Sequence, residues 1–412
     1  MKHPRRKRGK KKLSLDRISS LPPSIIDTIL YLLPIKDAVR TSILSREWRY
    51  NWTNIPVLRF RFDDFFVSET GTDALSILVQ TYDLPQEALG MINDHHYIDA
   101  MKQCFLLHKG PLLEFSLLAL EQTVEFDQLI GHLSMKNTLQ MLSIEMLNED
   151  SLPLSIFSMQ QLTKLSLRIF CINHYSNIKG FKNLTNLYLR DVKISTKTLL
   201  HIVSSCPLLK SFTLFIHDIL GNDKSSISDL IECLPIIERL IIHTGVYDRF
   251  YFDSLPPREQ LISLVHLKYL HIDDMCSYYS DDLPMFFHLI RSSPNLETVS
   301  LHVCDLTYSE TPITFKNYSN IWLKNLSELK IFGQFEIELN LEFVQLLLAK
   351  SPMLKKVSIY TRTYDDVSKL SRLLLDSPCA SGSIEIIVEY SDDVSMLWGL
   401  KNSPELTSML YR

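Results

Sequence analysis

Residues 162–167 read LTKLSL, and this spacing of apolar residues, L-x-x-L-x-L, returns along most of the chain. Apolar residues two positions apart indicate a strand with one buried face, because successive side chains of a strand point to opposite sides. Ten copies begin 22 to 30 residues apart, which leaves room for one strand and a return segment in each. The copies lie at 112–117, 139–144, 162–167, 184–189, 209–214, 237–242, 267–272, 296–301, 326–331 and 354–359.

The segments before several of these strands also repeat, as in SSCPLLKS at 204–211 and KSPMLKK at 350–356. A helix-like run ends there at a proline, which cannot continue a helix. We therefore predict outer helices within 195–207 and 340–352. One strand and one return segment in each such period are typical of leucine-rich repeats. The sequence predicts an α/β fold in which an irregular leucine-rich-repeat solenoid, a horseshoe, covers residues 97–365.

The leucines of this pattern form the core, so recognition residues are expected at the alternating positions, on the concave face of the sheet. Those positions carry a mixture of aromatic, histidine and arginine side chains, which is typical of protein-binding surfaces. The partner would be a protein target that the sequence does not identify. The predicted target-binding residues are Arg168, Tyr188, Arg190, Phe215, Arg239, His243, Tyr269, His271 and His302.

A different apolar stretch precedes the repeats, LPPSIIDTILYLLPIKDAVRTSILSREWRYNW at 21–52. Ser24 is predicted to cap a first helix that is apolar on most of its sides, and two shorter helices follow. Ser45 is predicted to cap the last of them, in which Trp48 and Trp52 share a face. Helices this apolar need covering, either by a partner protein or by the remainder of the chain.

From Asp16 to about Phe62 the chain resembles an F-box of the plant type. The resemblance rests on Asp16, Ile18, Leu21, Pro22, Ile29, Leu30, Leu33, Pro34, the run KDAVRTS at 36–42, Leu44, Ser45, Trp48 and Trp52. It departs at Glu47, where the family is usually basic, and at Asn51, which is often leucine. The resemblance implies a three-helix module that binds a Skp-type adaptor and, through it, a cullin ubiquitin ligase. The residues it assigns to adaptor binding are Leu21, Pro22, Ile26, Leu30, Leu33, Pro34, Val39, Leu44, Trp48 and Trp52, the two tryptophans lying at the adaptor edge or at the seam to the next domain.

The C-terminal part, from FVQLLLAKSP at 343–352 to SIEIIV at 383–388, resembles the FBD region of plant F-box/leucine-rich-repeat proteins. It departs at Cys379, where that family usually has arginine. The predicted organisation is a basic disordered tail at 1–12, an F-box at 13–62, a loop-rich linker at 63–96, the solenoid at 97–365 and an FBD-like region at 366–412 that completes or caps the solenoid.

Charge is distributed unevenly along the chain. Eight of the 43 Lys and Arg residues lie in residues 1–12, so the remaining 35 stand against 47 Asp and Glu, a formal net charge of −12. The basic run is read as a nuclear localisation signal, a phosphate-binding arm or a plain solvated tail. The acidic remainder repels phosphates and disfavours nucleic-acid binding.

Cysteine usage and hydropathy bear on the compartment. The seven cysteines are scattered singly without a CxxC pair, which favours reduced thiols. No apolar run reaches the length of a membrane span, and the basic start leads into LSLDRISS rather than into the apolar core of a signal peptide. We therefore expect a protein of the nucleus, the cytoplasm or both, without membrane association.

Motifs for chemistry are missing from the sequence. It contains no glycine-rich phosphate loop and no H-E-x-x-H, so no catalytic residue, cofactor or metal is expected. His95 and His96 are assigned to a loop. Cys104 and His108, four residues apart on a predicted helix, lack a third orienting group, and Cys104 is read as a core cysteine. The acidic pairs at 273–274 and 281–282 are assigned to solvated loops.

These inferences indicate the substrate-recognition subunit of an SCF-type (Skp-cullin-F-box) E3 ubiquitin ligase, which performs no chemistry itself. Two alternatives stay open. One is a leucine-rich-repeat scaffold that binds proteins without forming a ligase. The other is an F-box receptor with a small-molecule ligand in the concave face.

Overall fold

The structure is a computed structural model of the 412-residue chain, and it forms two compact units, residues 1–116 and 117–412. It describes residues 18, 21–46, 48–60, 94–119, 122–172, 180–215, 225–243, 250–251, 263–275, 282–303, 318, 321–333, 337–361, 364–375 and 377–390. The basic tail, most of the predicted linker and the last 22 residues of the FBD-like region, 391–412, lie outside the described residues.

The first unit begins with short helices. Its elements are α1 (Pro23–Leu32), α2 (Ile35–Arg40), the 3-10 helices η1 (Thr41–Ile43) and η2 (Trp48–Asn54), β1 (Val57–Phe60), α5 (Asp94–Leu107) and the first residues of β2 (Glu114–Ala119), which crosses into the second unit. The predicted cap of the first helix is wrong, because α1 already starts at Pro23 and has no side-chain cap. Proline fits the first helical position, where its missing N–H is not needed. The second predicted cap is confirmed, since the backbone N of Trp48 donates to Ser45 Oγ at 3.3 Å.

Residues 21–60, the N-terminal module, have a small core of their own. Buried in it are Ile26, Leu30, Ile35, Ala38, Trp48 and Trp52. Trp48 also donates through Nε1 to the carbonyl of Ile18 at 3.3 Å, which anchors the chain in front of α1. At the far end Arg59 pairs with Glu114 at 2.8 Å, with both side chains less than a fifth exposed. The module is thus connected to the start of β2 by a half-buried ion pair.

Helix α5 corrects the assignment of His95 and His96 to a loop and supports the helix predicted around Cys104. His95 and His96 lie inside this helix rather than in a loop, although their side chains lie outside the described ones. The helix follows from apolar residues that recur four positions apart, as Tyr97, Met101 and Phe105 do, a period that the two histidines alone do not show. His108 follows the helix directly, is buried, and its Nε2 lies 2.7 Å from the carbonyl oxygen of Ile55.

The second unit is built on one parallel sheet. Its strands are, in spatial order, β3 (Met141–Ser151), β4 (Lys164–Ile172), β5 (Asn186–Arg190), β7 (Ser211–Phe215), β9 (Arg239–His243), β11 (Tyr269–Met275), β12 (Thr298–Val303), β13 (Glu328–Gly333), β14 (Lys356–Thr361) and β15 (Glu385–Tyr390). Short β6 (Lys193–Ile194) pairs with β4, and β8 (Ser225–Ser226) pairs with β10 (Phe250–Tyr251). Every copy of L-x-x-L-x-L falls on a strand, the first on β2, so the predicted repeat solenoid is confirmed.

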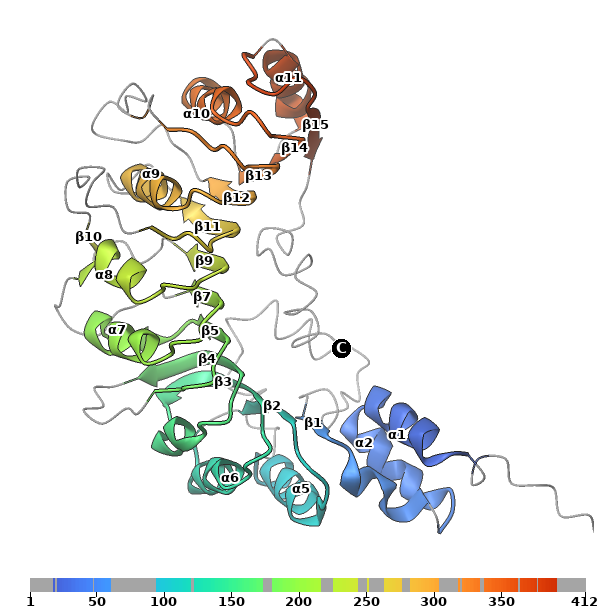
Figure 1. Cartoon of the computed structure of the whole chain (residues 1–412). Helices are drawn as coiled ribbons and strands as arrows, with labels where there is room; N and C mark the ends of the chain where they lie inside the picture. The colour runs from blue at the N-terminus through green and yellow to red at the C-terminus, as the bar shows by residue number, and fades with distance from the viewer. Residues whose placement is uncertain are drawn as a thin grey trace, which may run out of the picture. The chain divides into compact units, whose positions relative to one another are not determined.

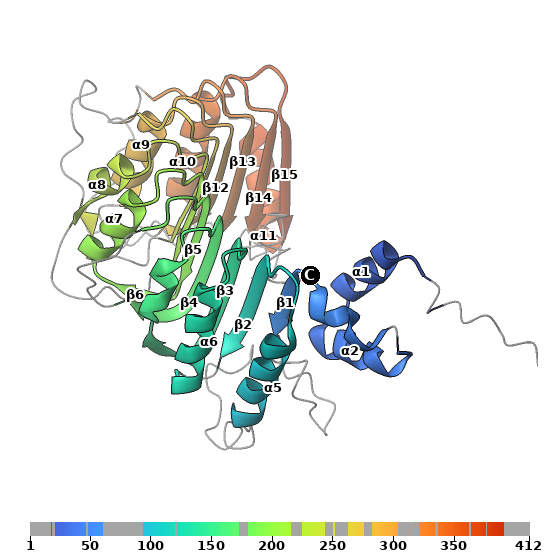
Figure 2. The same cartoon turned by 60° about the horizontal axis from the view of Figure 1, so that its bottom comes forward.

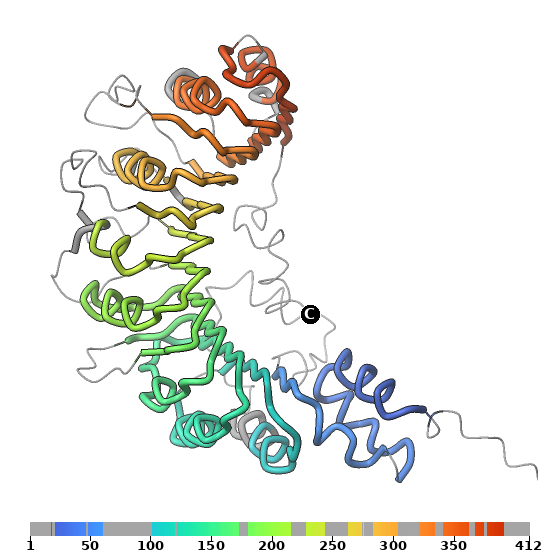
Figure 3. Tube along the Cα trace, in the orientation of Figure 1, coloured from blue at the N-terminus to red at the C-terminus, as the bar shows by residue number. Residues whose placement is uncertain are grey.

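Helices return the chain between these strands. They are α6 (Val124–Ser134), η4 (Leu154–Ser158), α7 (Thr196–Ser204), α8 (Ile227–Glu232), α9 (Asp282–Ser292), α10 (Ile337–Ala349) and α11 (Tyr364–Leu375). Figure 1 shows the α-helices of this unit along one face of the sheet, and the tube in Figure 3 shows the same course in successive repeats. The outer helices predicted within 195–207 and 340–352 are confirmed as α7 and α10.

The core of the second unit lies between the sheet and this helix layer. The leucine positions of the strands are enclosed there, with Leu142, Leu270 and Leu329 no more than 1% exposed. Burying a leucine side chain stabilises the fold by about 2 kcal/mol, and the repeats add such contributions strand by strand. Among the described residues, no helix combines the length and hydropathy needed to cross a bilayer.

Candidate functional site

The N-terminal module leaves several large apolar side chains in solvent. The exposed ones are Ile25, Tyr31, Leu32, Ile43, Leu44 and Tyr50, and Ile18 just before the module is exposed as well. Leu32, at the end of α1, is 74% exposed, and Ile43, in η1, is 86% exposed. Single exposed leucines are common, but so many within forty residues mark a surface suited to another protein.

The residues predicted to bind an adaptor divide by burial. Ile26, Leu30, Trp48 and Trp52 are buried, Leu21, Leu33 and Val39 are half-buried, and Pro22, Pro34 and Leu44 are exposed. The buried four stabilise the module itself. Ile25, Leu32 and Ile43 are exposed yet absent from the predicted set, because the family motif did not single them out. Their positions beside buried Ile26 and at helix ends become apparent only in the folded module.

Figure 2 shows the sheet of the second unit with its helices on one face. Side chains at alternate strand positions, between the buried leucine positions, belong to the opposite face, here called the polar face. Strand register aligns them in three rows. The start row is Met141, Lys164, Asn186, Ser211, Arg239, Tyr269, Thr298, Glu328, Lys356 and Glu385. The middle row is Ser143, Ser166, Tyr188, Thr213, Ile241, His271, Ser300, Lys330, Ser358 and Ile387. The end row is Glu145, Arg168, Arg190, Phe215, His243, Asp273, His302, Phe332, Tyr360 and Glu389.

Neighbours in the end row contact one another. Nη1 of Arg168 lies 2.7 Å from Glu145 Oε2, and the Arg190 guanidinium lies 5.7 Å from the ring centre of Phe215. Phe215 in turn contacts the His243 ring, with centroids 5.6 Å apart. Further along, the rings of Phe332 and Tyr360 are stacked with centroids 4.7 Å apart. Side chains held by their neighbours have little conformational freedom left to lose, so these contacts order the end row within the protein itself.

Asp273 lies at the centre of the polar face, and its assignment to a solvated loop is wrong. It belongs to β11 and is 3% exposed, because histidines of the flanking strands cover it. Nδ1 of His302 donates to its carboxylate at 2.9 Å, and Nε2 of His243 lies 3.9 Å away. Burial raises the pKa of Asp273, but the hydrogen bond from His302 and the neighbouring imidazoles outweigh it and lower the pKa overall.

His271 is completely enclosed beside this group. Burial lowers its pKa to about 4, so the ring is neutral at pH 7. Its Nδ1 lies 2.9 Å from Ser300 Oγ, while its Nε2 has no hydrogen-bond partner. A serine nucleophile would need that second nitrogen held by a carboxylate, whereas Asp273 is engaged by His302. The four side chains thus form two separate pairs, without the geometry of a catalytic relay.

All nine residues predicted to bind a target lie in these rows. Tyr188, Phe215, His243 and His271 are buried, whereas Arg168, Arg190, Arg239, Tyr269 and His302 are partly accessible. The period of two placed them on the right face. Their burial depends on neighbours one repeat away, on the adjacent strands, which no local window contains. The stack of Phe332 on Tyr360 has the same origin.

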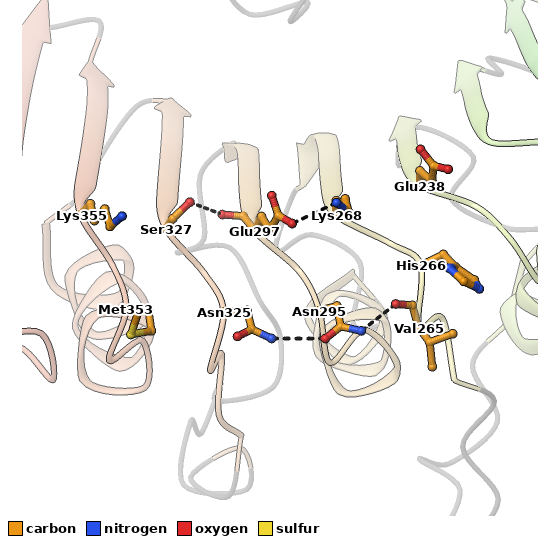
Figure 4. Close-up of a pocket in the computed structure, with 10 residues that line it drawn as sticks. All are labelled: Glu238, Val265, His266, Lys268, Asn295, Glu297, Asn325, Ser327, Met353 and Lys355. Carbon is orange, nitrogen blue, oxygen red and sulfur yellow. Dashed lines mark hydrogen bonds and ion pairs between the residues drawn. The ribbon is translucent and has the colours of Figure 1, made fainter.

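A groove of about 620 Å³ runs along the residues that precede β9 to β14 (Figure 4). It is lined by Glu238, Val265, His266, Lys268, Asn295, Glu297, Asn325, Ser327, Met353 and Lys355. Amide groups link successive repeats here, since Asn295 Nδ2 donates to the carbonyl of Val265 at 2.8 Å and Asn325 Nδ2 to that of Pro294 at 3.1 Å. The groove's polar groups are largely engaged with one another, as the Lys268–Glu297 ion pair at 3.3 Å also shows.

The described part of the chain contains five cysteines, none of them in a disulfide. Cys104, Cys171, Cys206, Cys233 and Cys379 are free thiols. Burial raises the pKa of the Cys104 thiol to about 11, which keeps it protonated and a poor nucleophile. Within those same residues, no group of three His, Cys, Asp or Glu side chains is arranged to hold a metal ion.

Comparison with known proteins adds to this geometry. The F-box domain model matches residues 18–60, and the model described as "FBD-associated F-box protein At5g56370, LRR repeats" matches residues 126–249. The chain is 25% identical to the F-box/FBD/LRR-repeat protein At1g13570 of Arabidopsis thaliana, over 88% of this chain and 95% of the relative. It is 30% identical to the FBD-associated F-box protein At5g27750 of the same plant, over 48% and 42%. Among solved structures, an internalin of Listeria monocytogenes covers 70% of this chain and 82% of its own, with 14% identity and a TM-score of 0.30.

Proposed function

Because this chain is a plant F-box/leucine-rich-repeat protein, we propose that it is the substrate-recognition subunit of an SCF-type ubiquitin ligase. The N-terminal module would bind a Skp-type adaptor and, through it, the cullin. The polar face of the repeats would bind the protein to be modified. The observation that carries the proposal is the exposed apolar surface of a module that the F-box model matches at residues 18–60.

The exposed side chains supply a driving force for adaptor binding. Leu32 and Ile43 are each at least 74% exposed, and burying one such side chain contributes about 2 kcal/mol. The module's own core, around Leu30 and Trp48, holds the helices in place before the partner arrives. Binding would then require little reordering of the module, which favours affinity.

The polar face supports target recognition. It presents several groups of contacting side chains that include tyrosine, phenylalanine and arginine, types enriched at the centres of protein interfaces. The ligase mechanism would be proximity: the target is held near the charged ubiquitin carrier, and its effective concentration rises without a catalytic group from this chain.

The proposal is tested by pull-down of the purified full-length protein with a Skp-type adaptor. Wild type is expected to bind, and the double variant Leu21→Ala/Pro22→Ala to lose most of the binding. Leu32→Lys and Ile43→Lys should each weaken binding at least about tenfold, since a charge replaces a buried apolar contact. Met135→Lys is the matched control, because Met135 is 78% exposed on the second unit, outside the module.

Folding of each variant is checked by circular dichroism, so a loss of binding is assigned to the surface and not to unfolding. Folded wild type that captures no adaptor would overturn the ligase proposal and leave a protein-binding scaffold. A target that is captured only with an added small molecule would favour the receptor alternative instead.

We also propose that the protein works in the nucleus, the cytoplasm or both, and that residues 1–12 act as an import signal. The support is the density of lysine and arginine in this segment. A fluorescent fusion of the full chain should be enriched in nuclei, and a variant with these basic residues changed to Ser should lose that enrichment. Equal distribution of the two fusions would contradict the import role.

A further inference from the structure

On β4 and β5, the side chains of Arg168 and Tyr188 each bury a hydrogen-bond donor on the polar face without an acceptor. The O–H of Tyr188, in a side chain 4% exposed, has no acceptor, and neither has the buried Nε–H of Arg168. Arg168 uses Nη1 for Glu145, which leaves its Nε–H unsatisfied. A buried donor without an acceptor destabilises a fold, so two of them on adjacent strands are an unusual feature that a bound ligand would explain. Both groups are donors, so a ligand that binds here must supply a hydrogen-bond acceptor.

The ionisation of Tyr188 decides what it offers a ligand. Burial raises the pKa of its phenol, and the positive charges of Arg190 and Arg168, together with a hydrogen bond from Arg190 to the phenol oxygen, offset this only in part. The phenol therefore stays protonated at neutral pH, and its O–H can donate a hydrogen bond to an acceptor on a ligand. The two flanking guanidiniums make a negatively charged acceptor preferable to a neutral one.

The charge of the polar face is divided between its two halves. On β4 to β9 the rows carry Lys164, Arg168, Arg190 and Arg239 and no acidic residue; on β11 to β15 they carry four acidic residues, Asp273, Glu328, Glu385 and Glu389, against two lysines, Lys330 and Lys356. Glu145, on β3, pairs with Arg168. Among the described carboxylates, none lies within ion-pair distance of Lys164. The basic half thus stands out on a chain that is acidic outside its tail.

The balance around Tyr188 indicates the charge of the ligand. Arg168 is paired with Glu145 at 2.7 Å and Arg190 with Asp191 at 3.4 Å. Together with Lys164, these groups carry one net positive charge. A single carboxylate neutralises that charge, whereas a dianionic phosphate would add one negative charge beside Glu145 and Asp191.

We propose that β4 and β5 bind an aspartate or glutamate side chain of the target, with Tyr188 and Arg168 donating to its carboxylate and Lys164 supplying the compensating charge. The proposal rests on the assignment of the polar face to target binding, and it adds the chemistry of the bound segment. An acidic segment over β4–β9 also avoids the acidic half of the same face, which fixes its position along the repeats.

The test uses the full-length protein and a fluorescent peptide of Glu-Ser repeats, compared with the same peptide of Gln-Ser repeats, in anisotropy titrations at low salt. The Glu peptide is expected to bind at least about tenfold more tightly than the Gln peptide. Tyr188→Phe should weaken binding of the Glu peptide about tenfold, the magnitude of a hydrogen bond to a charged group. The same variant should melt at a temperature close to that of wild type, because the O–H that it removes has no acceptor.

Lys164→Gln and Lys356→Gln form a matched pair, since both lysines occupy the start row, on β4 and β14. Only Lys164→Gln should weaken binding of the Glu peptide. Equal binding of the two peptides, an unchanged affinity of Tyr188→Phe, or equal effects of the two lysine variants would overturn the proposal. None of these titrations involves the adaptor, so failure here leaves the pull-down result standing, and failure of the pull-down leaves these titrations interpretable.

Discussion

The N-terminal module and the repeats both contain dense runs of leucine and isoleucine, but they place them oppositely. Leu32 is 74% exposed and Ile43 86% exposed in the module, whereas Leu329 on β13 is fully buried. In the repeats, each strand is covered by its neighbours and by the helix layer. The module has about forty residues, too few to enclose all its apolar surface. An apolar pattern in the sequence therefore shows which side chains need burial. The size of the surrounding domain decides whether the chain itself can bury them or whether some stay exposed for a partner.

The largest effect on stability should come from replacing a buried leucine of the repeats by alanine, compared with the same change at an exposed leucine of the module. Leu329→Ala removes a buried side chain from between two layers and is expected to cost about 2–5 kcal/mol of the free energy of unfolding in urea. Leu32→Ala should change that free energy by less than about 0.5 kcal/mol, since its side chain is mostly in water. Losses of similar size for the two variants would show that Leu32 already belongs to a core.

Lowering the pH should reduce the stability of the repeats, because His271 is buried in its neutral form. Its pKa is lowered to about 4, whereas the unfolded chain binds this proton near pH 6.5. Its contribution to stability is therefore complete above pH about 6.5 and is lost as the pH falls towards 4, by about 3 kcal/mol at most. His271→Gln should flatten the dependence of the urea midpoint on pH across that window.

Asp273 also makes the stability depend on pH, and this part of the dependence should remain in His271→Gln. Its pKa is also lowered, so its stabilisation is present above the unfolded value near 4 and is lost only below it. The variant His266→Gln, at an exposed position before β11, is the control. Identical pH slopes for His271→Gln and wild type would show that the acid sensitivity arises elsewhere.

Glycine substitutions should give the smallest effect and opposite signs in the two units. A Cβ on Gly110 would lie 2.7 Å from the carbonyl oxygen of Asn54 and 2.8 Å from its Cα, so Gly110→Ala forces the backbone apart at the end of the module, at a cost of about 1–3 kcal/mol. Gly131, within α6, has nothing within 4 Å of such a Cβ, and Gly131→Ala should gain about 0.5–1 kcal/mol. Thermal melts of both variants measure this, and a destabilised Gly131→Ala would contradict it.

Much of the fold could be predicted from local pattern. The ten leucine patterns located their strands because burial of one face imposes a period of two, and the prolines at 207 and 352 located helix ends because proline cannot continue a helix. The same period placed Arg168, Tyr188 and His271 on the correct face. These inferences need only the residues of one repeat.

What the sequence by itself determined, then, is the order of strands and helices, the face on which each side chain lies and the resemblance of residues 16–62 to an F-box. Only the tertiary structure decided that His271 is enclosed, that Asp273 is buried between His243 and His302, and that the Tyr188 hydroxyl lacks an acceptor. The physical reason is separation along the chain. Burial and hydrogen bonding on the polar face depend on side chains from neighbouring strands, about thirty residues apart in sequence, which meet only when the repeats stack.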